Sequence, residues 1–226
     1  MAQFVKNYVQ DLAQDIQIRH CGTLIFNTDS DSNVINVSLY NGQEEAPQSG
    51  SVACAVICSD GSTVPVTGGT ISGNETEMSG GAVYLNDSST FIMTGGEISN
   101  NKAHGEGDDK TIGKGGGVAV CGDANFFMSG GVIKDNKADN LGGGVYVDTD
   151  GIVCLTGGHI TGNWSKNWWG LARCGGSGVA AYSDIYLGGD IKITGNTDWR
   201  NDPDNLLLRA KVKHAAGQKA KIPDEP

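Results

Sequence analysis

The sequence predicts an all-β protein: a short right-handed parallel β-helix preceded by a small antiparallel β module. Gly is abundant, at 35 of 226 residues, and shows no collagen-like period of three. A phrase of two glycines, a variable residue, an isoleucine and a closing asparagine recurs, and a second Gly-rich phrase with a β-branched strand alternates with it. Repeats too short to bury a core alone form stable structures by stacking.

Residues 1–67 are expected to form the antiparallel module. Strand-like runs at 23–26, 34–40 and 52–57 are accompanied by polar turn signals, of which Asn41-Gly42 and Asp60-Gly61 are the sharpest. Along 34–40 the apolar residues alternate with polar ones, as in a strand with one buried face.

The β-helix is expected over residues 68–200, and residues 201–226 form a C-terminal strand or tail. The closing asparagines are separated by steps of 27, 35, 27 and 33 residues, and the longer steps contain the insertions 104–114 and 164–174. Without these insertions the period is about 25 residues, roughly one coil of a β-helix. Each coil should contain two short apolar strands and a third, weaker one.

Columns of identical residues are expected to fill and close the coils. The isoleucines of the first phrase and the valines of the second should point into the core, where β-branched residues suit the pleated backbone. The recurring asparagines should form a hydrogen-bonded amide ladder at a corner. A feature repeated at every coil indicates architecture, whereas a catalytic site is normally a single constellation. The expected ladder residues are Asn74, Asn101, Asn136, Asn163 and Asn196.

No residue is assigned as catalytic or metal-binding, and no cofactor is expected. Four aspartates follow the second phrase where a turn must occur, and turn chemistry explains them together: Asp87, Asp123, Asp150 and Asp184. The alternative is that Asp148 and Asp150 are the acid and nucleophile of a glycosidase. The acidic residues Glu106, Asp108 and Asp109 lack the spacing of a known calcium loop, so a solvated insertion is favoured.

The aromatic insertion 164–174 is the best candidate for ligand binding. Flat indole rings stack on sugar rings or nucleobases, and neighbouring polar groups orient the ligand. The alternative is that the loop folds back and its indoles cover an open strand or a lateral face of the helix. The candidate ligand-binding residues are Trp164, Lys166, Asn167, Trp168, Trp169, Arg173 and Trp199.

Charge and composition narrow the partners and the compartment. The formal net charge of −10 argues against nucleic acid, because phosphate contact needs a basic face. The first residues contain no apolar run long enough for a secretory signal or a membrane span. Retention in the cytosol is therefore expected unless the protein leaves as part of a particle. The six cysteines are scattered without a CxxC pair, which favours reduced thiols.

Two family resemblances rest on particular phrases. On "RHCGT", "NVINVSLYNG" and "DGSTVPVTGG", residues 11–74 resemble the N-terminal domain of phage and prophage upper-baseplate (BppU-type) tail proteins. In that family the domain attaches the protein to the tail, and distal parts face the host. On the Gly-Gly and Asn-ended repeats, residues 68–196 are similar to polymorphic outer-membrane-type adhesins. This second resemblance implies the fold more than the function, since β-helices occur in adhesins, lyases and tailspikes.

We therefore expect a non-enzymatic phage or prophage tail or baseplate protein whose β-helix contacts the host surface. It would be assembled in the bacterial cytoplasm and reside in the virion tail. Its partners would be other tail or baseplate subunits and a host surface glycan, and a homotrimer is compatible with this role. One alternative is a bacterial surface adhesin or glycan-binding β-helix protein. Another is a polysaccharide-degrading enzyme, a lyase or glycosidase.

Overall fold

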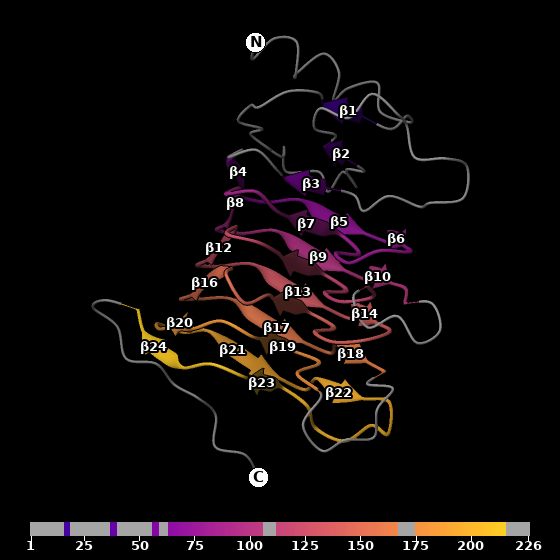
Figure 1. The fold of residues 1–226 in the computed structure, drawn as a ribbon, viewed down its shortest axis with the longest axis vertical. Coiled ribbons are helices and arrows are strands. Elements are labelled where there is room, and N and C mark those ends of the chain that lie inside the picture. Colours follow the sequence, from indigo (N-terminus) through magenta and orange to yellow (C-terminus); the bar gives the residue numbers. More distant parts are fainter. Residues whose placement is uncertain are drawn as a thin grey trace.

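The computed structural model describes residues 16–18, 37–39, 56–58, 63–105, 112–166 and 175–215. All regular secondary structure in these residues is β. The chain winds into a stack of coils with up to four short strands each, and strands of successive coils pair in parallel (Figure 1). The predicted all-β fold with a parallel β-helix is confirmed, although each complete coil has four strands rather than the three expected.

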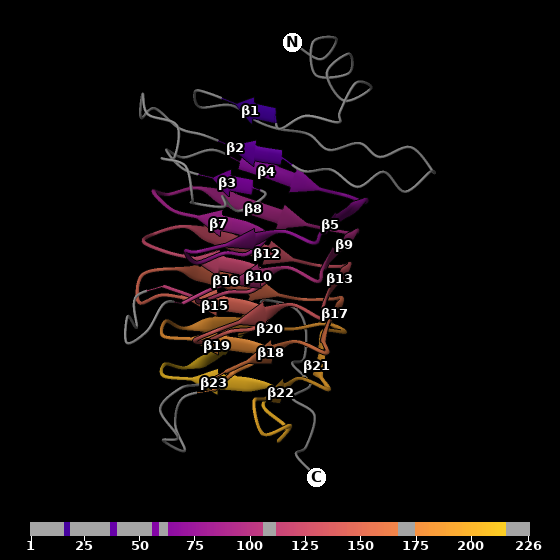
Figure 2. The ribbon, with the colours of Figure 1, turned by 90° about the vertical axis from the view of Figure 1, so that its right-hand side faces the viewer.

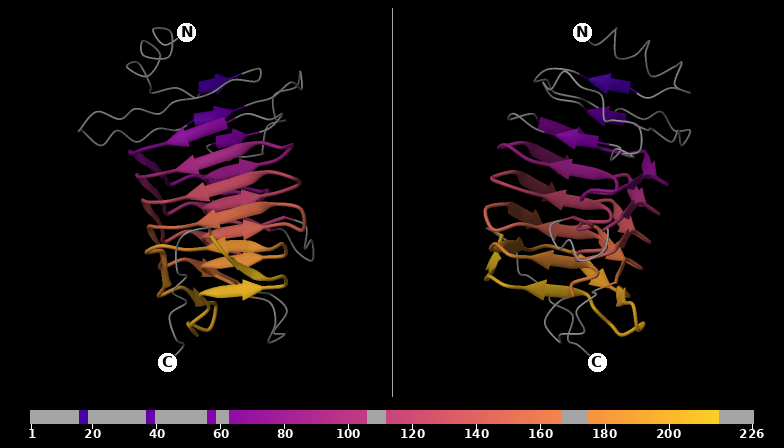
Figure 3. Two further views of the ribbon diagram at one scale, coloured as in Figure 1. Left: turned by 90° about the vertical axis from the view of Figure 1, so that its left-hand side faces the viewer. Right: turned by 45° about the vertical axis from the view of Figure 1, so that its right-hand side comes forward.

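Two six-stranded sheets carry the apolar runs of each coil. Sheet A contains β3 (Val56–Cys58), β7 (Val83–Leu85), β11 (Val118–Val120), β15 (Val145–Val147), β19 (Val179–Ala181) and β23 (Leu206–Leu208). Sheet B contains β4 (Thr63–Val66), β8 (Thr90–Met93), β12 (Asn125–Met128), β16 (Ile152–Leu155), β20 (Ile185–Leu187) and β24 (Val212–His214). The sheets stack the coils along one axis in sequence order (Figures 2 and 3).

Two five-stranded sheets complete each coil. Sheet C contains β5 (Thr70–Ser72), β9 (Glu97–Ser99), β13 (Val132–Lys134), β17 (His159–Thr161) and β21 (Lys192–Thr194). Sheet D, to which no strand was assigned from the sequence, contains β6 (Glu75–Thr76), β10 (Lys102–Ala103), β14 (Lys137–Ala138), β18 (Trp164–Ser165) and β22 (Thr197–Asp198).

The core consists of aligned columns of apolar side chains. The phrase isoleucines pair in register from Ile71 to Ile193, and the valines of sheet A pair in register from Val56 to Val179. All of these side chains are buried. The core is therefore one continuous apolar column along the axis, in which each coil gains its stability from the coils on both sides.

The described strands near the N-terminus are not antiparallel. β1 (Ile16–Ile18) pairs with β2 (Val37–Leu39) in parallel, and β2 lies against β3 (Figure 2). β3 and β4 already belong to sheets A and B, so the stack begins before residue 68. An alternating apolar pattern shows that one face of a strand is buried, but it does not show the direction of the neighbouring strand. The expected turns at Asn41-Gly42 and Asp60-Gly61 lie outside the described residues.

The stack also continues past residue 200. β23 and β24 pair in parallel with β19 and β20, although their residues lack the Gly-Gly phrases of the earlier coils. Leu206, Leu208 and Val212 pack against the core but remain half-buried. The C-terminal strand expected in this region is thus a partial last coil within the described residues.

The repeated asparagines form a continuous ladder at the corner between sheets C and D. In each coil from Asn74 to Asn163, the backbone N–H and Nδ2 both donate to Oδ1 of the next ladder residue, at 2.8 to 3.0 Å. Nδ2 of Asn101 also donates to the carbonyl of Ile71 in the coil before, at 3.0 Å, and later members repeat this contact. Each internal amide therefore joins three successive coils.

Asn205, which stands outside the repeated phrase, ends the ladder. Its Oδ1 accepts the backbone N–H and Nδ2 of Asn196 at 3.1 and 3.0 Å. In the previous coil Gly178 has the equivalent place before sheet A, and a Cβ there would lie 2.7 Å from Nδ2 of Asn196. The Asn196 amide thus fills the corner of that coil, and position 178 has room only for glycine. Within the described residues the last coil has no such amide, and the Asn205 side chain occupies the space.

Candidate functional site

Three of the predicted ligand-binding residues lie in the described part of the chain, on sheet D and the turn after it. Trp164 begins β18, is half-buried and pairs with Lys137 and Thr197 on the neighbouring strands. Lys166 follows β18, and its backbone N–H donates to the carbonyl of Ala138 at 3.0 Å. The other candidates lie outside the described residues: Asn167, Trp168, Trp169 and Arg173.

Trp199 stands at the tip of a tight turn that follows β22. The carbonyl of Asp198 accepts the N–H of Asn201 at 3.0 Å, and its carboxylate accepts the N–H groups of Arg200 and Asp202 at 2.8 and 3.0 Å. The Trp199 side chain is 48% exposed, and the guanidinium of Arg200 lies 4.8 Å from the centre of its ring. The turn therefore presents an aromatic surface with a cation fixed beside it.

The outward positions of sheet D place cations in line with Trp164. In β10, β14 and β18 the first residue faces outward and the second is buried. The outward residues Lys102, Lys137 and Trp164 are direct neighbours in the pairing register. We call these three residues the lysine–tryptophan column. Since paired strands lie about 4.8 Å apart, the column presents one functional side chain per coil.

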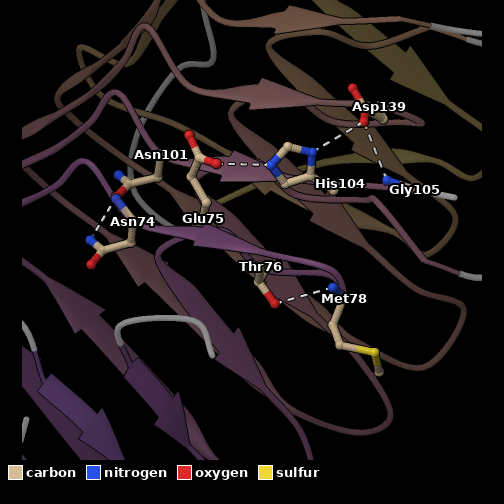
Figure 4. A network of polar contacts seen from close by, with 8 residues as sticks. All are labelled: Asn74, Glu75, Thr76, Met78, Asn101, His104, Gly105 and Asp139. Atoms are coloured by element: carbon tan, nitrogen blue, oxygen red, sulfur yellow. Dashed lines mark hydrogen bonds and ion pairs between the residues drawn. The ribbon is translucent and has the colours of Figure 1, made fainter. Parts of the chain in front are cut away.

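A histidine between two carboxylates lies at the N-terminal end of the same face (Figure 4). Nε2 of His104 lies 3.1 Å from Oε2 of Glu75, and Nδ1 lies 3.7 Å from Oδ2 of Asp139. The Asp139 carboxylate also accepts the N–H of Gly105 at 3.4 Å. Three successive coils are thus joined across the outside of sheet D, next to the insertion whose residues Glu106, Asp108 and Asp109 lie outside the described residues.

The aspartates between sheets A and B take part in turns. Asp87 has a left-handed backbone with φ of 50°, and Asp123 accepts the backbone N–H and hydroxyl of Ser88. These hydrogen bonds from Ser88 lower the pKa of Asp123. Asp184 accepts the N–H of Lys211 and pairs with Lys213 at 2.7 Å, and these contacts, Lys213 first, lower its pKa.

Asp148 and Asp150, the alternative glycosidase pair, also form hydrogen bonds within a turn. Asp148 accepts the Tyr146 hydroxyl at 3.3 Å and the N–H of Thr149 at 2.9 Å, and Asp150 accepts the Thr149 hydroxyl at 3.4 Å. Burial, followed by the Asp148 charge, raises the pKa of Tyr146. Tyr146 therefore remains a neutral donor, and its ring packs in a small apolar cluster on the outside of sheet A.

Within the ranges given above, no group of histidine, cysteine and acidic residues has an arrangement that could hold a metal ion. No helix in that part of the chain is long and apolar enough to cross a membrane. Cys121 and Cys154 are free thiols, and burial raises the pKa of each.

Sequence reasoning missed Lys102, Lys137 and His104 as members of a surface site. The available signal was their position directly after the ladder: Asn101-Lys102, Asn136-Lys137 and Asn163-Trp164 are equivalent dipeptides. Only three strands were expected in each coil, and none was assigned to the residues directly after the ladder asparagine, so the outward residues of sheet D were not aligned from coil to coil.

Comparison with known proteins found no family model, no curated protein and no solved structure that matches this chain.

Proposed function

We propose that this is a phage or prophage tail-associated structural protein whose β-helix is a rigid shaft and whose sheet D contacts a glycan on the host surface. The observation that carries the glycan contact is the arrangement of Trp164 and Trp199 on adjacent coils, with Lys166 and Arg200 beside them. An indole ring provides a flat apolar face for a pyranose, and the cations provide donors for its hydroxyl groups.

The shaft role is supported by the construction of the coils. The repeated isoleucines, valines and asparagines maintain the stack, so only residues outside these columns are free to vary for recognition. A site on such a scaffold is held by backbone pairing on both sides, which keeps its side chains in place for a ligand. The tail setting is supported by the resemblance of residues 11–74 to baseplate proteins.

Glycan binding is tested with the purified full-length chain on an array of bacterial surface glycans. We expect Trp164→Ala and Trp199→Ala each to weaken binding to the recognised glycan about tenfold, because each removes a stacking surface. Phe127→Ala is the matched control, since Phe127 is a 39% exposed aromatic residue on sheet B. Equal binding by all three variants and the unaltered protein would show that sheet D makes no contact with the glycan.

The tail setting needs a separate experiment. Tail particles purified from an induced host should contain the protein in a fixed ratio to a known tail subunit. A protein found instead on intact bacterial cells and never in tail particles would favour the adhesin, which uses the same face. Release of reducing ends or unsaturated products from polysaccharide by the purified chain would favour the enzyme.

A further inference from the structure

The two lysines of the lysine–tryptophan column are adjacent, and neither has an ion-pair partner among the described residues. Lys102 and Lys137 are paired in register on β10 and β14, and neither forms an ion pair with a described carboxylate. Like charges directly opposite each other on a sheet are destabilising. In a chain with a net charge of −10, two unpaired neighbouring cations on one face are therefore a local exception.

The carboxylates nearest to the two lysines contact His104 instead. Glu75 is the register neighbour of Lys102 on β6, but its carboxylate contacts His104 at 3.1 Å (Figure 4). Asp139, two positions after Lys137, is directed to His104 and to the N–H of Gly105. Both carboxylates thus contact His104, and neither forms an ion pair with Lys102 or Lys137, so the two ammonium groups can pair with an anion from outside the protein.

We propose that Lys102, Lys137 and Trp164 form consecutive subsites for an acidic saccharide chain that lies parallel to the β-helix axis, with one sugar unit for each coil. The coil spacing of about 4.8 Å is close to the length of one pyranose unit in an extended chain. A pyranose stacks on Trp164, and the acidic groups of the next two units pair with Lys137 and Lys102.

The ligand class follows from the composition of the column. A neutral sugar does not require two unpaired ammonium groups side by side, whereas a uronate or a sugar phosphate neutralises both. A nucleic acid is a poorer match, because its affinity comes from many phosphate contacts and this chain is acidic overall. This inference rests on the proposed glycan contact and specifies its charge and direction.

The test uses the full-length protein, an oligogalacturonate and the same oligomer after reduction of its carboxyl groups to neutral galactose units. Titration calorimetry should show at least tenfold tighter binding of the acidic oligomer. In the double variant Lys102→Gln/Lys137→Gln we expect this preference to disappear while binding of the neutral oligomer is unchanged. Trp164→Ala should weaken both oligomers by a similar factor. Thermal unfolding verifies that each variant is folded.

Two controls separate this site from general attraction of polyanions. Lys192→Gln/Lys211→Gln removes the same charge from exposed lysines outside the column and should keep the preference for the acidic oligomer. Single-stranded DNA of equal charge should bind at least tenfold more weakly than the oligogalacturonate, and a phosphodiester-linked oligosaccharide tests phosphate as the acidic group.

The outcomes distinguish this inference from the function on which it rests. If the neutral oligomer binds as tightly as both acidic oligosaccharides and depends on Trp164, the glycan contact stands and the acidic class is overturned. If DNA binds equally well, or if the control variant loses the preference too, the column is not a saccharide site. If neither acidic oligosaccharide binds, the inference is wrong, and the array result decides the glycan contact separately.

Discussion

The contribution of each ladder asparagine to stability depends on how many hydrogen bonds it forms with the coils on both sides. Asn136 is fully buried; it accepts two hydrogen bonds from Asn101 and donates to Asn163 and to the carbonyl of Ile98. Asn205, at the end of the ladder, is half-buried and receives bonds from one side. The same side chain should therefore contribute unequally at these two places.

We expect Asn136→Ala to lower the free energy of unfolding by about 3 kcal/mol or more, because it leaves buried donors of Asn101 without an acceptor. Asn205→Ala should lower it by about 1 kcal/mol, since truncation of the half-buried Asn205 side chain opens the donors of Asn196 to water. Urea denaturation followed by circular dichroism measures both. Asn125→Ala, at a partly exposed position of sheet B, is the control and should have little effect. Similar losses for Asn136→Ala and Asn205→Ala would contradict this account.

Repetition made the five ladder residues of the repeated phrase predictable, whereas Asn205 was not predicted from the sequence. Asn74 to Asn196 recur in one phrase, and an amide at a repeated corner has few roles besides a ladder. Asn205 precedes a strand without the repeated phrase. Its side chain occupies the place of the next ladder amide, and this place is evident only from the three-dimensional packing. Trp164 and Trp199 were identified by residue type, but the lysines beside Trp164 required the register of sheet D.

At the scale of strands, the ion pair between β9 and β13 makes stability depend on pH. Nζ of Lys134 lies 2.9 Å from Oε2 of Glu97, and both side chains are about one-third exposed. The hydrogen bond from Ser99, followed by that from Lys134, lowers the pKa of Glu97. A lowered acid pKa contributes stability above its unfolded value and loses it as pH falls through the folded value.

We expect Glu97→Gln to be less stable than the unaltered protein at pH 7, by at most about 1 kcal/mol because the pair is partly exposed. The difference should shrink as the pH falls from the ordinary glutamate pKa through the lowered folded-state pKa, because below the folded-state value Glu97 is protonated in both states. Thermal unfolding between pH 7 and pH 3 measures it. Glu77→Gln removes the same charge from a residue with no ion pair among the described residues and should show no such trend.

Strand direction was the part of the fold that the sequence could not supply near the N-terminus. The alternation along 34–40 is equally compatible with a parallel or an antiparallel neighbour, and the described strands β1 to β4 proved to have parallel partners. From residue 68 onward, the repeated phrases required equivalent residues to stack, and this requirement fixed a parallel arrangement. The parallel topology could therefore be predicted from the repeated phrases, but not from the strand propensity of individual segments.

At the scale of the whole molecule, each coil contacts only its neighbours, so one obstruction in the middle should divide the stack. A Cβ at Gly144 would lie 2.6 Å from the carbonyl oxygen of Gly178 and 3.0 Å from Nδ2 of Asn163. A Cβ at Gly73 would meet nothing within 4 Å, although its φ of +71° is left-handed. Gly73 is therefore a matched control, at which only backbone strain is added.

We expect Gly144→Ala to lower the free energy of unfolding by about 3 kcal/mol, because the methyl group forces adjacent coils apart. Hydrogen exchange should then increase in β15 and β19 on both sides of the obstruction and divide unfolding into two transitions, as in repeat proteins with a weakened interface. Gly73→Ala should cost about 1 kcal/mol and keep a single transition. A single transition in Gly144→Ala with the same loss as Gly73→Ala would mean that the coils tolerate separation and that stability is not transmitted along the stack.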